Sequence, residues 1–134
     1  MLVYYARAVD RCDWAEVQSS RDSIVAAFAQ RGMRIINQFS DGFDSDRELV
    51  ESQIANIEKC DILVAELTIP DHPYVGCIGE IIYAHQMGKR VYVVYGGYDH
   101  ITQRPWMSYH VDGFFRTYDE LFSFLEINRI SGTS

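Results

Sequence analysis

The residue best placed to do chemistry in this sequence is Glu80. An apolar segment ends at Glu66, a proline-containing loop follows, and Gly76 stands four residues before Glu80. A carboxylate placed beyond the carboxyl end of a buried strand is well sited to meet a small polar substrate. It can attack an anomeric carbon, or stabilise the positive charge that develops there when a glycosidic bond breaks. The plain alternative is that Glu80, expected in the first turn of a helix, only complements the helix dipole.

Further polar side chains are expected near the first strand. Tyr4 and Tyr5 are predicted to end this strand on opposite faces, so that one of the two hydroxyls can orient the carboxylate. Arg7 and Asp10 follow just beyond, and Arg7 or Arg11 could bind an anion. The ordinary alternatives are packed aromatic rings for the tyrosines and solvated side chains for the arginines.

Three more residues bear on the same site. Glu66, at the carboxyl end of the third predicted strand, could face the ligand pocket. Gly76 and Gly79 leave room for a ligand to approach the backbone closely. We therefore expect the site in front of this strand–loop–helix segment.

Strands and helices alternate along the chain. Apolar runs predict strands over residues 2–6, 33–36, 61–66, 90–95 and 114–115. Amphipathic spacing and capping-box patterns predict helices over residues 13–31, 45–59, 77–87 and 117–125, with a long loop over 96–111. The alternation is typical of a single α/β domain over residues 1–134, with a mainly parallel five-stranded sheet. Right-handed crossovers favour a doubly wound, flavodoxin-like order with helices on both faces.

Composition argues against several classes of partner. The net charge is -7 at pH 7, whereas nucleic-acid polymers and anionic membranes attract basic surfaces, so neither is expected as a partner. The three cysteines are odd in number and lack metal-ligand spacing, which favours a reducing, cytoplasmic compartment. The four histidines are scattered, so the sequence predicts no metal and no other cofactor.

Residues 61–94 resemble the nucleoside 2-deoxyribosyltransferase family. The resemblance is carried by Asp61-Ile-Leu-Val-Ala-Glu-Leu, a proline loop, Gly76-x-x-x-Glu80-x-x-x-Ala84 and Gly88-Lys-Arg-Val. It implies a flavodoxin-like fold and one of two activities. Transferases of the family exchange bases between 2'-deoxyribonucleosides through a covalent sugar–Glu intermediate, and relatives hydrolyse the N-glycosidic bond of nucleoside 5'-monophosphates.

The resemblance also implies roles for individual residues. Glu80 would be the nucleophile, Tyr4 would lie beside it, and Gly76 would open the loop that admits the sugar. The segment from Ser108 to Asp112 would reach into the site of a neighbouring subunit, because family members form dimers or higher oligomers with shared sites. The implied ligands are a nucleoside or nucleotide and a free nucleobase.

Three features depart from the family pattern, one of which is a loop between Pro70 and Gly76 that is longer than in the monophosphate hydrolases. Gln53, with Glu51 nearby, stands where the family usually has an aspartate that holds a sugar hydroxyl. The glycine- and serine-rich phosphate turn of the hydrolases is missing after Tyr5, although Arg7 or Arg104 could bind a phosphate instead. The residues predicted to bind substrate are Tyr5, Arg7, Asp10, Gln53, Gly76, Ser108 and Asp112.

The sequence therefore predicts an enzyme that cleaves an N-glycosidic bond. The favoured reaction is transfer of 2-deoxyribose between nucleobases through a covalent sugar–Glu80 intermediate, with an acid such as Asp10, or water, protonating the departing base. Hydrolysis of (deoxy)nucleoside 5'-monophosphates is the alternative within this class. A non-catalytic nucleotide-binding or sensing module, in which Glu80 only recognises a ribose, is a third interpretation.

Overall fold

The computed structural model describes residues 1–9, 11–36 and 43–130, which contain a parallel five-stranded sheet. Its strands are β1 (Leu2–Arg7), β2 (Arg34–Ile35), β3 (Ile62–Glu66), β4 (Arg90–Val94) and β5 (Gly113–Phe115). They lie in the order β2-β1-β3-β4-β5, and each neighbouring pair is parallel. This is the flavodoxin-like doubly wound order, so the predicted fold class is confirmed. The order reverses between β1 and β3, where such folds bind ligands.

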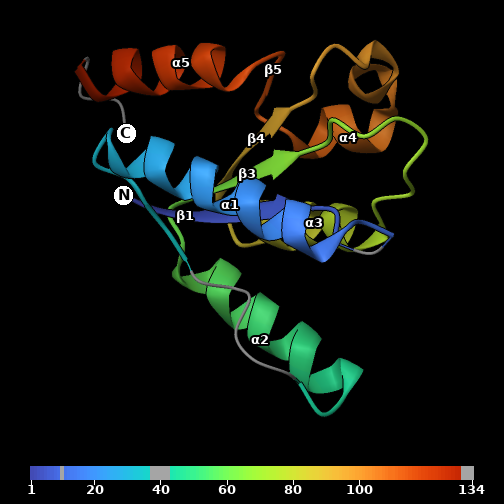
Figure 1. The fold of residues 1–134 in the computed structure, drawn as a ribbon. Coiled ribbons are helices and arrows are strands. Elements are labelled where there is room, and N and C mark those ends of the chain that lie inside the picture. The colour runs from blue at the N-terminus through green and yellow to red at the C-terminus, as the bar shows by residue number, and fades with distance from the viewer. Residues whose placement is uncertain (10, 37–42, 131–134) are drawn as a thin grey trace.

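Helices cover both faces of the sheet (Figure 1). They are α1 (Trp14–Ala29), α2 (Asp46–Lys59), α3 (Val75–Gln86), the 3-10 helix η1 (Asp99–Gln103), α4 (Pro105–His110) and α5 (Tyr118–Ile130). Phe28 of α1 and Leu121 of α5 pack in one core cluster, and Ile57 of α2, Ile81 of α3 and Met107 of α4 pack in the other. The first cluster therefore lies under α1 and α5, and the second under α2, α3 and α4.

Strand β1 lies between β2 and β3 in the sheet. The side chains of residues 3–6 have no exposed surface, because both faces of the strand are covered. Tyr4 belongs to the cluster under α3 and Tyr5 to the cluster under α1, which confirms that the two tyrosines point to opposite faces. They lie within β1 rather than at its end, since pairing with β3 continues to Arg7 and Glu66.

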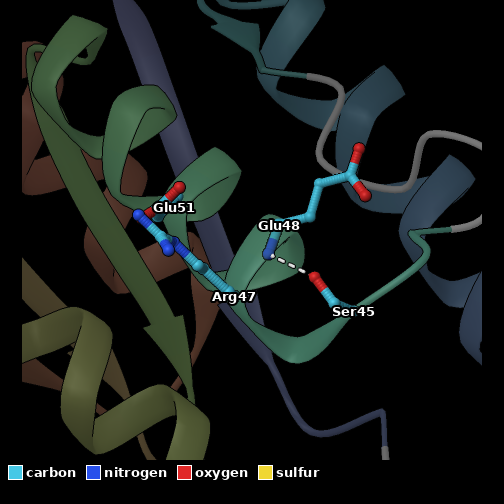
Figure 2. Close-up of polar contacts among 4 residues, drawn as sticks. All are labelled: Ser45, Arg47, Glu48 and Glu51. Atoms are coloured by element: carbon cyan, nitrogen blue, oxygen red, sulfur yellow. Dashed lines mark hydrogen bonds and ion pairs between the residues drawn. The ribbon is translucent and has the colours of Figure 1, made fainter.

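Helix α2 lies at the bottom of Figure 1, and its neighbour among the helices is α3. The predicted capping box is confirmed, because the backbone N–H of Glu48 donates to Oγ of Ser45 over 3.2 Å (Figure 2). Only one residue of the helix, Ile57, is buried. Near the carboxyl end, Nζ of Lys89 donates to the carbonyl of Glu58 over 2.9 Å. The body of the protein thus holds α2 mainly through its carboxyl-terminal turns.

The structure corrects two predictions of local structure. The predicted loop over 96–111 contains η1 and α4, and α4 begins at Pro105, because proline suits the first position of a helix. Helix α3 begins at Val75, earlier than predicted, because Tyr74 caps it in the left-handed conformation with φ 54°. Glu80 therefore lies in the second turn, and the first turn of α3 holds no acidic residue. A simple dipole role for Glu80 is thereby weakened.

Candidate active site

Glu80 and Tyr4 form a direct pair between α3 and β1. The hydroxyl of Tyr4 donates a hydrogen bond to the carboxylate of Glu80. Cys77, Ile81 and Ala84 hold α3 on the sheet, which turns Glu80 toward the flank that faces α2. Tyr4 is fully buried and Glu80 is partly buried, so the pair lies at the boundary between core and solvent.

Burial sets the electrostatics of this pair. Loss of solvent raises the pKa of Glu80 to about 7, while the hydrogen bond from Tyr4 acts in the opposite direction by stabilising the carboxylate. Burial, followed by the nearby Glu80 charge, raises the pKa of Tyr4 above its ordinary value, so its hydroxyl stays protonated and donates. Near pH 7 about half of the Glu80 carboxyl groups are ionised, and the oriented carboxylate is more basic than that of an exposed glutamate.

A cleft of about 180 Å³ between α2 and α3 gives access to Glu80. Its lining residues, which define the Glu80 cleft, are Val50, Gln53, Ile54, Ile57, Gly76, Gly79, Glu80 and Tyr83. A Cβ atom added to Gly76 or Gly79 would meet nothing within 4 Å, so both glycines border open space. The Glu80 cleft therefore combines one carboxylate and one amide with a largely apolar wall, which suits a small polar ligand with an apolar face.

Two of the predicted substrate-binding residues, Gln53 and Gly76, share the Glu80 cleft. Glu51, the acidic residue close to Gln53 in sequence, instead pairs with Arg47 over 3.0 Å on an exposed face of α2 (Figure 2). The sequence reasoning missed Tyr83. Its position one turn after Glu80 was a usable signal, because residues three apart on a helix share a face.

Tyr5 and Arg7 are not brought together with Glu80. The hydroxyls of Tyr5 and Tyr118 both donate to Oε1 of Glu66, over 3.1 and 2.6 Å, on the face covered by α1 and α5. Glu66 therefore faces away from the Glu80 cleft. Burial raises the pKa of both tyrosines, and the negative charge of Glu66 raises it further. Nε of Arg7 donates to the carbonyl of Ala8 over 3.0 Å.

The remaining predicted residues lie elsewhere in the chain. Oγ of Ser108 donates to the carbonyl of Thr102 over 2.9 Å. Oδ2 of Asp112 accepts from the backbone N–H of Val91 over 2.8 Å, near the amino end of β4. Neither residue lines the Glu80 cleft of its own chain. Asp10 falls outside the described residues.

The described part of the chain shows neither a metal cluster nor a membrane-spanning helix. In the part of the chain that the structure describes, no group of three or more His, Cys, Asp or Glu side chains gathers as a metal site would require. No helix among those residues is long and apolar enough to span a membrane. Cys60 and Cys77 are buried in the core beside Tyr4, as packing residues would be.

Comparison with known proteins adds evidence on the fold. The sequence matches no protein-family model and no curated protein. The structure is similar to a CMP N-glycosidase of Clostridium botulinum, with a TM-score of 0.63 and 18% identity over 95% of this chain and 98% of that one. It is also similar to a 2-deoxyribosyltransferase of Bacillus psychrosaccharolyticus (TM-score 0.71, 14% identity, 91% and 90% covered). A 2-deoxyribosyltransferase of Leishmania mexicana gives a TM-score of 0.70 at 12% identity, with 92% and 95% covered. At these identities the likeness establishes a shared fold, over almost the whole length of each chain.

Proposed function

We propose that this protein cleaves the N-glycosidic bond of a nucleoside or nucleotide, with Glu80 as the nucleophile. The observation that carries the proposal is the Tyr4–Glu80 pair at the wall of a small cleft. The fold shared with an N-glycosidase and with deoxyribosyltransferases supports it, as does the family resemblance of residues 61–94.

The chemistry follows from an oriented carboxylate. An oxygen of Glu80 attacks C1' of the sugar as the bond from C1' to the base nitrogen breaks, and the electron pair leaves with the base. The base takes a proton from an acid, for which Asp10 or water is the candidate. Tyr4 is not consumed, and its hydroxyl holds the carboxylate toward C1' and favours its ionised form. The product of this step is a sugar bonded covalently to Glu80.

The second step decides between transfer and hydrolysis. In transfer, a nitrogen of a second base attacks C1', the bond to Glu80 breaks, and the carboxylate is restored. The proton of that nitrogen returns to the group that protonated the first base. We favour transfer of 2-deoxyribose, because the phosphate turn of the hydrolases is missing after Tyr5. The apolar wall of the Glu80 cleft supports this choice, since it limits the access of water to the intermediate.

Hydrolysis of a nucleoside 5'-monophosphate is the second candidate. It is favoured by the likeness to the CMP N-glycosidase, which covers 95% of this chain and 98% of that one. In this reaction water replaces the acceptor base, and the products are a free base and a sugar phosphate.

A substrate panel tests both candidates. Deoxynucleosides, ribonucleosides and their 5'-monophosphates are incubated with the protein, each with and without a free acceptor base, and the products are separated by chromatography. Transfer gives a new nucleoside only when acceptor is present, and hydrolysis gives free base from a monophosphate without acceptor. Glu80→Gln should abolish either reaction, whereas Glu51→Gln, on the exposed face of α2, should not. Unchanged turnover in Glu80→Gln would refute the proposal.

We also propose that the protein acts as a homodimer or higher homo-oligomer in which the segment from Ser108 to Asp112 completes a neighbouring site. In support, Trp106 and Tyr109 of α4 are 70% and 72% exposed, a costly arrangement for large aromatic rings in an isolated chain. Light scattering after size-exclusion chromatography measures the mass. A monomer at assay concentration with full activity would contradict this proposal.

A further inference from the structure

A second, larger cavity lies on the other flank of α3. Its volume is about 510 Å³, and its walls come from the loop between β3 and α3, from η1 and the start of α4, and from Arg11 after β1. Ile78 forms part of the wall, and two residues along a helix differ in direction by about 200°, so Ile78 and Glu80 face different flanks. Among the described residues, this cavity and the Glu80 cleft share no lining residue. We call it the Arg104 cavity.

The Arg104 cavity gathers positive charge in an acidic protein. Arg11 and Arg104 line it, and Asp71 is the single acidic residue among its described lining residues, although the whole chain carries a net charge of -7. His72 and His100 line it as well. The structure shows no ion pair between either arginine and a described acidic residue. An anion bound in this concavity would be attracted by both guanidinium groups.

The backbone that lines the Arg104 cavity takes uncommon conformations. The described residues include three non-glycine residues with positive φ, and all three line this cavity: Arg11 at 61°, Asp71 at 59° and Tyr74 at 54°. Such conformations persist only where the surroundings enforce them, and they cluster at ligand sites. At Tyr74 the side chain is anchored by its buried hydroxyl, which accepts from the N–H of Ile69 over 2.6 Å and donates to its carbonyl over 3.1 Å.

A histidine helps to hold the backbone of this wall. The backbone N–H of Tyr74 donates to Nδ1 of His72 over 3.1 Å, so Nδ1 is the acceptor nitrogen of the ring. The cavity offers guanidinium donors from two separate segments, Arg11 after β1 and Arg104 before α4, and guanidinium groups match the geometry of phosphate oxygens.

We propose that the Arg104 cavity binds the phosphate group of a small phosphorylated molecule, at a site separate from the Glu80 cleft. The arginines supply paired N–H donors that match phosphate oxygens, and the volume exceeds what a phosphate ion fills, leaving room for a sugar-sized organic part. Binding there requires no reaction at Glu80, so the inference does not rest on the proposed function.

Binding measurements on the whole chain test the site. Ribose 5-phosphate and inorganic phosphate are titrated by calorimetry at constant ionic strength, with ribose as the uncharged comparison. We expect both phosphates to bind and ribose not to bind. Arg11→Gln and Arg104→Gln should each weaken binding by about tenfold or more, since a charge-assisted contact is lost. Arg34→Gln, on the edge strand β2, is the matched control and should bind as the unaltered chain does.

Several results would overturn the inference. The first is that the unaltered chain does not bind phosphate. The second is that Arg11→Gln and Arg104→Gln bind phosphate as tightly as the unaltered chain while circular dichroism shows that they are folded. The third is that Arg34→Gln weakens binding as much as they do. A saturating deoxynucleoside should leave the binding of ribose 5-phosphate unchanged, and mutual exclusion would place the phosphate in the Glu80 cleft and refute a separate site. Phosphate binding without any turnover would refute the proposed function and leave this inference standing.

Discussion

Replacing Tyr4 by phenylalanine should move the pH dependence of the reaction without dismantling the site. The substitution removes only the hydroxyl that donates to Glu80, in a residue that is otherwise fully buried. That hydrogen bond favours the ionised carboxylate, so its loss raises the pKa of Glu80 further from its present value of about 7. A hydrogen bond to a charged group contributes about 1.5–3 kcal/mol, or roughly one to two pKa units.

The size of the effect on rate follows from this shift. At pH 7 a carboxyl with a pKa of about 7 is half ionised, whereas one with a pKa of about 8–9 is ionised to roughly a tenth to a hundredth. If only the carboxylate attacks, kcat/KM at pH 7 falls about 5- to 50-fold in Tyr4→Phe. Most of the loss in kcat/KM should disappear above pH 9, because Glu80 is then largely ionised in both the unaltered protein and Tyr4→Phe.

The assay is kcat/KM for nucleoside cleavage measured from pH 5 to 10. Tyr5→Phe is the matched control, because Tyr5 follows Tyr4 in β1 but bonds Glu66 on the opposite face of the sheet. We expect its pH profile to match that of the unaltered protein. Two results would refute the reasoning. One is that the rise of kcat/KM with pH occurs at the same pH in Tyr4→Phe as in the unaltered protein, and the other is that kcat/KM falls by the same factor at every pH.

Three further predictions concern stability and the Glu80 cleft. The folded-state pKa of Glu80 lies above its unfolded value, about 7 against 4.5, so the protein should lose about 3 kcal/mol of unfolding free energy as pH rises from 4.5 through 7. Glu80→Gln should remove that part of the pH dependence in urea unfolding, and the same slope in both proteins would contradict it. Gly79→Leu should fold, because a Cβ atom at residue 79 meets nothing within 4 Å. The leucine side chain should fill the Glu80 cleft and lower kcat/KM on the order of 100-fold. Gly79→Ala is the control for the change in helix propensity. Ser45→Ala should destabilise α2 by about 1 kcal/mol, seen as faster hydrogen exchange at its first turn, and unchanged exchange would contradict the capping role.

Local rules predicted much of the fold. Both capping boxes are present, with the N–H of Glu48 bonded to Ser45 and the N–H of Glu120 bonded to Thr117 over 3.2 Å in each case. They could be predicted because a cap depends only on residues three apart. The opposite orientation of Tyr4 and Tyr5 could also be predicted, since alternation is a property of any strand.

Features that depend on tertiary contacts could not be predicted. Tyr74 takes a left-handed conformation that is rare for residues other than glycine. No local sequence pattern predicted that α3 would begin directly after it. Glu66 is bonded by Tyr118, 52 residues away, so its face could not be known before the fold was known. In the site itself, Gln53 and Gly76 join Glu80 because α2 and α3 are neighbours, a pairing that follows from topology rather than from spacing.

The most direct test of the central claim is to trap the sugar on Glu80. The protein is mixed with a deoxynucleoside in the absence of acceptor base, quenched in acid, and examined by intact-protein mass spectrometry followed by peptide mapping. The account predicts a mass increase of one deoxyribosyl group, located on Glu80, which disappears on addition of acceptor base and is missing in Glu80→Gln. Turnover with the sugar attached to another residue, or an undiminished adduct in Glu80→Gln, would contradict it.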